Sequence, residues 1–322
     1  MKRTIAVIVV LVISTLALLP VEAQGSLDKA EKQALFERLE RARELGDSYT
    51  SYVEQEILVG DVSMNLTGLL TMSFSTYINS DMTTTYSYGE VPTALRLMTV
   101  EVENAEDDVT EAYTVTAEAR RVDAVVYVQA TREAEDEFGL DPMPDGWVMA
   151  ESEWDLPYAL DDLELSDLFS DYEEDASEEL GGEVLTDLEY FMRAEITMEN
   201  DVLPDGTPVE VYSISYSDED LYELLSESPD LLNEDEALTM LLLENLSEGS
   251  IFDVAFALDA EDNLRMVEVT IFMELAAIDL SVVDPTLPEG AGVMSMYLDM
   301  YSMYEVTDIN APVEPITAPE ME

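Results

Sequence analysis

Carboxylates dominate the side chains of this 322-residue chain that could perform chemistry. The sequence holds 73 Asp and Glu residues but no histidine and no cysteine. Ser-His-Asp and Cys-His nucleophilic catalysis and histidine zinc sites are therefore excluded. Two carboxylates could still hydrolyse a glycoside, but among so many acids a close pair carries no information. No phosphate-binding glycine loop occurs, so we expect a protein that is not an enzyme and that has no cofactor.

One acidic segment, DAEDNLRMVEVT at residues 259–270, superficially follows the pattern of a calcium-binding loop. Leu264 stands where that loop needs glycine, and Thr270 stands where it needs a terminal glutamate. A hairpin turn near residues 260–263 fits the segment better. We therefore predict no metal site here.

A second unusual segment, GVMSMYLDMYSMYEV at residues 292–306, contains four methionines and three tyrosines. If it is a strand, alternate side chains lie on opposite faces. One face then carries Met294, Met296, Leu298, Met300, Ser302, Tyr304 and Val306. Because methionine suits irregular gaps and adaptable surfaces, this face is either a methionine-rich core or the wall of an adaptable apolar cavity.

The N-terminal segment has the pattern of a secretory signal peptide. Lys2 and Arg3 precede an apolar run over residues 5–19, and Val21-Glu22-Ala23 matches a small-residue cleavage site. We expect a signal peptide over residues 1–23 and a secreted or extracytoplasmic protein, in the periplasm or at the cell surface. An uncleaved membrane anchor is the alternative.

The charge balance is extreme, with 13 Lys and Arg against the 73 acids and a formal net charge of −60. Such a charge repels nucleic acid, so we expect no nucleic-acid partner. It also destabilises the compact state by self-repulsion. Molar salt, which shortens the Debye length to about 3 Å, would relieve this repulsion, and we expect a halophilic protein. An acidic habitat is the alternative.

The elements that must position these residues begin with an amphipathic helix. Asp28 and Glu31 form a capping-box pattern, apolar residues then recur at helical spacing, and Gly46 ends the helix. The helix carries five basic residues. We expect its basic side to pack on the acidic body of the protein, and a solvated cationic face is the alternative.

From residue 49 to about residue 131 the apolar period changes to two. The predicted strands span 49–59, 65–78, 82–88, 95–103, 110–119 and 122–131. They are joined by short polar turns, such as Asn79-Ser80-Asp81 and residues 104–108. Because short connections join antiparallel neighbours, these strands form a meander.

The second half of the chain alternates predicted strands with two helical inserts. The expected elements are a short strand carrying Trp147, short helices in 161–183, a strand over 190–200, a tight turn and another strand within 203–216, helices in 218–247, a hairpin over 250–275 and the methionine-rich strand. This gives about eleven antiparallel strands and one layer of helices. We expect a single α+β domain over residues 24–309, followed by a Pro-rich tail over 310–322.

Three segments carry a resemblance to a known family: LPDGTPVEVYSI, FALDAEDNLRMVEVTIFME and MYEVTDINAPVEPITAP. Together with the order of elements, they resemble the LolA-like superfamily of extracytoplasmic lipid carriers, especially the LppX/LprAFG-like lipoproteins. The resemblance implies a strongly curved half-barrel sheet with helices over its concave face and an apolar cavity between them. Lipoproteins of this kind carry a lipobox cysteine, which this chain lacks, so a soluble shuttle or surface-associated protein is expected.

If the resemblance holds, apolar residues from several elements would line the cavity, and the helix over residues 237–246 would be its lid. The predicted cavity residues are Leu70, Met72, Phe74, Met192, Ile196, Met198, Leu238, Leu241, Leu242, Val269, Ile271, Met273, Met294, Met296, Leu298 and Met300. The expected ligand is a lipid or another hydrophobic molecule.

Two functions remain open at this point. The first is a monomeric, non-enzymatic carrier that exchanges its ligand with a membrane donor or acceptor protein. The second is an envelope-associated structural or interaction protein, with the same fold but with no ligand cavity.

The charge balance generates a first testable prediction. The melting temperature of the protein should rise steeply between low and molar sodium chloride, because salt screens the repulsion among carboxylates. Thermal unfolding followed by circular dichroism measures it. A melting temperature that stays constant across this range would exclude the halophilic interpretation, and a rise on acidification alone would favour the acidic habitat.

Overall fold

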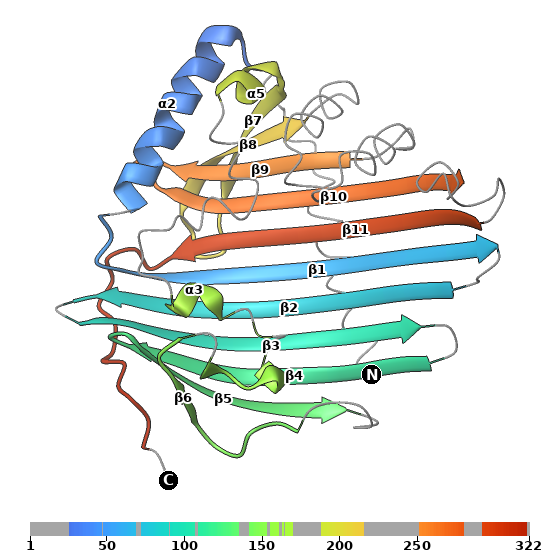
Figure 1. Ribbon diagram of the computed structural model, residues 1–322. Coiled ribbons are helices and arrows are strands. Elements are labelled where there is room, and N and C mark those ends of the chain that lie inside the picture. Colours follow the sequence, from blue (N-terminus) through green and yellow to red (C-terminus); the bar gives the residue numbers. More distant parts are fainter. Residues whose placement is uncertain are drawn as a thin grey trace.

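Period-two alternation in the sequence produces one antiparallel sheet, in which the described residues form eleven strands (Figure 1). The computed structural model describes residues 26–46, 48–68, 72–89, 91–106, 109–134, 142–152, 155–160, 163, 165–169, 188–215, 251–279 and 292–320. The strands are β1 Ser51–Gly68, β2 Met72–Tyr88, β3 Pro92–Glu106, β4 Val109–Val122, β5 Val125–Ala134, β6 Val148–Ala150, β7 Glu195–Val202, β8 Pro208–Ser215, β9 Ile251–Asp259, β10 Leu264–Asp279 and β11 Gly292–Thr307. The predicted number of about eleven strands is confirmed for this part of the chain.

The first and last strands pair at the centre of the sheet. The order across the sheet is β6-β5-β4-β3-β2-β1-β11-β10-β9-β8-β7, and β1 pairs with β11 from Val53 opposite Thr307 to Gly68 opposite Gly292. Strands β2 to β6 therefore lie on one side of this pair, and strands β10 to β7 lie on the other side (Figure 1).

We call the face of the sheet against which the helices pack the helix-side face. The longest helix, α2 (Lys29–Gly46), buries Leu35, Phe36 and Leu39 against side chains of β7 to β10 such as Ile214 and Phe256. On the other flank, a 3-10 turn η2 (Tyr158–Leu160) and α3 (Ser166–Phe169) belong to a core with side chains of β2 to β5. Two separate cores thus lie on the helix-side face, one on each flank of the central strands.

The N-terminal cap of α2 has the predicted geometry. The amide of Asp28 donates to Glu31 Oε2 at 2.8 Å, and the amide of Glu31 donates to Asp28 Oδ1 at 3.0 Å. This reciprocal capping box satisfies backbone donors that the first turn of a helix leaves without partners.

The basic side of α2 packs on acidic residues of β8 and of the turn between β9 and β10, as expected. The guanidinium of Arg38 donates to Glu210 Oε2 at 2.6 Å, to Tyr212 Oη at 2.7 Å and to Asp262 Oδ1 at 2.7 Å. Hydrogen bonding from Arg38 lowers the pKa of Glu210. Burial would raise the pKa of Asp262, but the hydrogen bonds from Arg38 and Arg41 outweigh burial and lower it.

The predicted turn at Asn79-Ser80-Asp81 is wrong, because these residues lie in the middle of β2. All three pair with β1 on one side and with β3 on the other side. Ser80 is buried on the helix-side face, while its two neighbours point to the opposite face. The expected strand over 65–78 is therefore divided between the end of β1 and the start of β2, and β2 continues through the expected strand over 82–88. β1 ends at Gly68 instead of residue 59.

The strand predicted to begin at residue 190 is also wrong at its start. Residues Leu188–Arg193 form a short helix, α5, and β7 begins at Glu195. Phe191 of α5 and Ala194, directly after the helix, are both buried in the core beneath α2. Met192 therefore belongs to a helix and not to the predicted strand face.

Several predictions fall on residues that the structure does not describe. These are the signal peptide over 1–23, most of the acidic stretch 161–183, the helices in 218–247, and the proposed lid over 237–246. Across the part of the chain that is described, no helix is both long and apolar enough to cross a membrane.

The contact between α2 and the sheet generates a prediction about stability. Arg38→Met should lower the free energy of unfolding at neutral pH by about 1–3 kcal/mol, because it removes three hydrogen bonds of a charged donor. Glu210 and Asp262 have lowered pKa values in the folded state. The stability that they contribute is therefore present above their unfolded pKa values and is lost as the pH falls through their folded ones.

Urea unfolding at neutral and at acidic pH tests this prediction. The difference between Arg38→Met and the parent protein should shrink on acidification. Arg41→Met is the matched control, because Arg41 contacts the same Asp262 but its side chain is 52% exposed. The Arg41→Met control should lower the free energy of unfolding by less than about 1 kcal/mol. Equal costs for both variants would show that Arg38 does not anchor the helix.

Candidate functional site

The predicted methionine face of β11 continues across the neighbouring strands. Met296 lies opposite Met64 of β1, which lies opposite Phe74 of β2. The next rows along the strands bring further apolar residues of β1, β2, β10 and β11 into register. We call this set the methionine surface: Gly60, Val62, Met64, Phe74, Ile78, Ile271, Met273, Met294, Met296, Leu298 and Met300.

The methionine surface is only partly covered. Phe74 is 41% exposed and Met64 is 38% exposed, and the other side chains of the surface are half-buried. Only Ile78 and Ile271, at its margins, pack against the two cores of the helix-side face. The central strands therefore carry an apolar area between two packed flanks. Accessible apolar patches of this kind mark binding surfaces in many proteins.

A glycine stands at the centre of the methionine surface. Gly60 of β1 lies between Ile78 of β2 and Met300 of β11. A Cβ atom added to Gly60 would have no heavy atom within 4 Å, so the space above this position is open. A glycine inside a strand often marks a place where a ligand or another backbone comes close.

Seven of the predicted cavity residues come together on this surface. They are Phe74, Ile271, Met273, Met294, Met296, Leu298 and Met300. Met72, at the start of β2, is in register with Leu66 of β1.

The other predicted residues lie elsewhere. Ile196 and Val269 are buried in the core beneath α2, Met198 packs against that core, and Met192 lies in α5. The remaining four, Leu70, Leu238, Leu241 and Leu242, are outside the described residues.

Sequence reasoning missed the contribution of β1, namely Gly60, Val62 and Met64. The signal was present, because apolar and glycine positions alternate from Leu58 to Leu66. Only the pairing between β1 and β11 shows that these positions face the same space as the methionines.

Toward the start of β1, the helix-side face becomes polar and aromatic. Beyond Leu58 it carries Glu56, which is partly exposed, and Glu54, which is buried. Tyr304 Oη donates a hydrogen bond to Glu54 Oε2 at 3.1 Å. Burial, and then the charge of Glu54, raise the pKa of Tyr304 well above its ordinary value, so this phenol stays protonated.

Three further tyrosines surround this polar end. The rings of Tyr52 and Tyr86 have centroids 4.7 Å apart, and the rings of Tyr86 and Tyr88 are stacked at 6.3 Å. The phenol oxygens of Tyr52 and Tyr88 are 3.3 Å apart. Burial raises the pKa of Tyr88 to about 12, so its hydroxyl is also neutral at ordinary pH.

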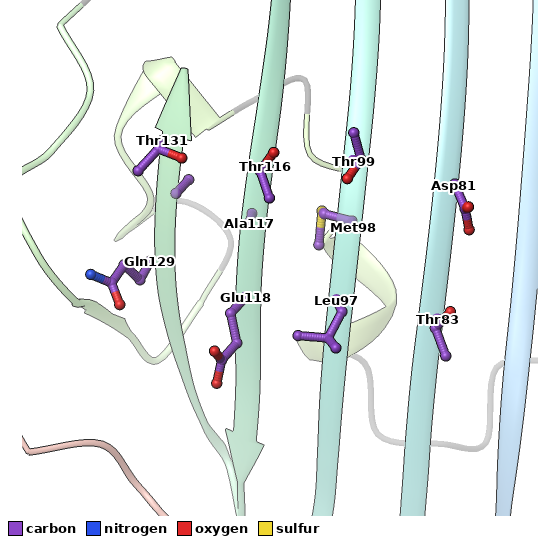
Figure 2. Close-up of a pocket in the computed structure, with 11 residues that line it drawn as sticks. Asp81, Thr83, Leu97, Met98, Thr99, Thr116, Ala117, Glu118, Gln129 and Thr131 are labelled. Carbon is purple, nitrogen blue, oxygen red and sulfur yellow. The ribbon is translucent and has the colours of Figure 1, made fainter. Parts of the chain in front are cut away.

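An open depression of about 520 Å³ lies on the opposite face of the sheet, over β2 to β5 (Figure 2). Its floor consists of two rows of paired residues, one of Asp81, Thr99, Thr116 and Thr131, the other of Thr83, Leu97, Glu118 and Gln129. Threonine and charged side chains are typical of a solvated strand surface. None of the predicted cavity residues lines this depression, and we assign no function to it.

The described residues contain no group of three Asp or Glu side chains that could hold a metal ion. The methionine surface itself has no group that could act as a nucleophile or base. Its chemistry is limited to the burial of apolar area. Hydrogen-bonding groups lie beside it at Thr76, whose Oγ1 donates to Asn104 Oδ1 at 2.9 Å, and at the end that carries Glu56.

Comparison with known proteins adds little to this geometry. The chain matches no protein-family model and no curated protein. Among solved structures, it is similar to the crystal structure of a DUF1329 family protein from Desulfovibrio piger, with 12% sequence identity and a TM-score of 0.13. That match covers 83% of this chain and 90% of the other chain. A TM-score this low carries no argument about fold or function.

The exposure of the methionine surface generates a prediction about stability. Phe74→Ala should lower the free energy of unfolding by only about 1 kcal/mol, because much of its ring is already in solvent. Phe256→Ala, on the same face but fully buried, should cost about 3–5 kcal/mol. Urea unfolding of both variants provides the measurement. Similar costs would mean that Phe74 is part of a packed core.

Proposed function

We propose that this protein is a non-enzymatic binding protein that carries an apolar, lipid-like ligand on the methionine surface. The observation that carries the proposal is the open space above Gly60, at the centre of a continuous apolar area. Burying an apolar chain there would remove both the ligand and the partly exposed side chains from water. Each buried methylene contributes about 0.8 kcal/mol.

The composition of the surface supports a flexible ligand of variable shape. Met64, Met294, Met296 and Met300 have unbranched side chains with polarisable thioethers, which adapt to irregular neighbours. A packed core would instead favour residues with well-defined rotamers. The absence of histidine and cysteine from the sequence and the apolar lining support binding over catalysis.

The finer architecture is part of the same proposal. A LolA-like half-barrel would curve the sheet around the methionine surface, and helices over the concave side would enclose the ligand. In this arrangement residues 237–246, which are apolar around most of the helix, would be the lid. A signal peptide over residues 1–23 would place the protein outside the cytoplasm, where it would exchange lipid with a membrane donor or acceptor.

Filling the space above Gly60 tests the function. Gly60→Phe should leave the free energy of unfolding unchanged or raise it by up to about 1 kcal/mol, because glycine is unfavourable inside a strand. The same variant should lose the binding of Nile red, a neutral apolar dye, measured by fluorescence titration. Ser63→Phe is the matched control, because it adds the same ring to the opposite face of β1, and it should bind the dye as the parent protein does.

Two outcomes would contradict the proposal. If the parent protein takes up no dye, and native mass spectrometry after gentle extraction finds no bound lipid, the methionine surface is not a binding site. An envelope-associated structural protein would then be the better interpretation. If Gly60→Phe unfolds the protein, the space above Gly60 is not open.

A further inference from the structure

A pair of uncharged polar side chains lies at one margin of the methionine surface. Thr76 stands between Phe74 and Ile78 on the helix-side face of β2, and it is in register with Val62 of β1. Its Oγ1 donates a hydrogen bond to Oδ1 of Asn104 on β3 at 2.9 Å. The side chains of one row therefore change from apolar to polar between β10 and β3, in the order Met273, Leu298, Val62, Thr76 and Asn104.

The hydrogen bond between Thr76 and Asn104 leaves the amide nitrogen of Asn104 with unused donors. The carbonyl oxygen of this side chain accepts from Thr76, whereas its NH₂ group carries two N–H donors. Within the described part of the chain, these two donors have no acceptor. Both residues are half-buried, so a ligand can reach them in surroundings that are partly shielded from water, where a hydrogen bond is stronger than in bulk solvent.

The pair is within reach of a chain that lies on the methionine surface. Neighbouring strands are about 4.8 Å apart, so Thr76 is about 5 Å from Val62 across the sheet and Asn104 is about 10 Å from it. Gly60, with open space above it, is the next position along this face of β1. An apolar chain above β1 and β11 can therefore place a polar group at Thr76 and Asn104 without leaving the sheet.

A negative charge stands next to this pair. Glu111 of β4 lies directly opposite Asn104 on the same face, and it is exposed. A carboxylate or phosphate bound at Asn104 would face this second negative charge, and the net charge of −60 acts in the same sense. A cationic group would gain little from an exposed carboxylate and could not accept the hydrogen bonds that Asn104 offers.

We infer that the ligand of the methionine surface is an amphiphile whose polar group is uncharged and accepts hydrogen bonds, such as an ester or amide carbonyl. Asn104 donates to this group, and Thr76 positions the Asn104 amide. The inference rests on the proposed function and narrows it to one class of ligand. Fatty acids, phosphorylated amphiphiles and alkylamines bind less tightly, because each has a charged polar end.

Three probes with chains of equal length and different polar groups test the inference. They are N,N-dimethyldodecanamide, which is uncharged and only accepts hydrogen bonds, dodecanoate, and dodecyltrimethylammonium. Each is titrated below its micellar concentration in molar sodium chloride, which screens the net charge, with displacement of Nile red as the readout. The amide should bind at least about threefold more tightly than either charged probe.

Asn104→Leu removes the donors and keeps nearly the same side-chain volume. It should weaken the binding of the amide probe by about three- to tenfold and leave the affinity for dodecyltrimethylammonium unchanged. Asn79→Leu is the matched control, because Asn79 Nδ2 donates to Glu101 Oε2 at 3.2 Å between the same two strands but on the opposite face. This control should change neither affinity.

Thr76→Val tests the positioning role and serves as a second variant if Asn104→Leu does not fold. It removes the hydroxyl that holds the Asn104 amide, so it should reduce the preference for the amide probe by about two- to threefold. Thr83→Val makes the same replacement on the opposite face of β2 and should keep the preference.

The outcomes separate this inference from the function on which it rests. If the dye does not bind and no probe binds, the proposed function fails. If the three probes bind equally, or a charged probe binds best, the protein binds apolar chains but the preference for an uncharged acceptor is wrong. If Asn79→Leu reduces the preference as much as Asn104→Leu does, Asn104 does not contact the ligand and the inference is overturned.

Discussion

The pairing of β1 with β11 is the constraint on which the rest of the structure depends. It joins the two ends of the chain at the middle of the sheet, so each half of the protein is a meander that extends outward from one of these strands. Without this pair, the core beneath α2 and the core beneath α3 would belong to two unconnected sheets. The same pair places the methionines of β11 beside the alternating apolar positions of β1, so it creates the candidate site as well as the architecture.

The two cores cover the flanks of the helix-side face but leave its central strands partly exposed. The candidate site is therefore an accessible apolar surface between two packed regions. On the flanks, short helices bury residues such as Phe191 and Leu168 completely. Between them, Met64 and Phe74 remain more than a third exposed, although their strands are among the longest in the sheet. A polar group buried there without hydrogen-bond partners would strongly destabilise the fold. The partly exposed apolar side chains destabilise it only through their contact with water, and a ligand that covered them would recover that free energy.

Local features of the fold were predictable from the sequence. The capping box at Asp28 and Glu31 depends on residues three positions apart, and the alternation over residues 292–306 is a property of one strand. The turn predicted at residues 79–81 was wrong because polar side chains alone do not define a turn. The alternation of side chains between the two faces of the sheet continues through Ser80. Asn79 and Asp81 therefore lie on the opposite face, where polar side chains can contact solvent. Gly60 and Met64 could not be assigned to the site, because their positions depend on a pairing between distant segments.

The methionine surface is also sensitive to oxidation. The chain has no cysteine, so the thioethers of methionine are its most readily oxidised side chains. The thioethers of the methionine surface are within reach of solvent. Conversion to the sulfoxide makes an apolar side chain polar, and at these positions it would turn a surface suited to hydrocarbon into one that prefers water. The buried cores contain mainly aliphatic and aromatic residues and would keep the sheet folded. Oxidising conditions would therefore weaken the ligand binding that we propose while leaving the sheet folded, and reduction of the sulfoxides would restore it.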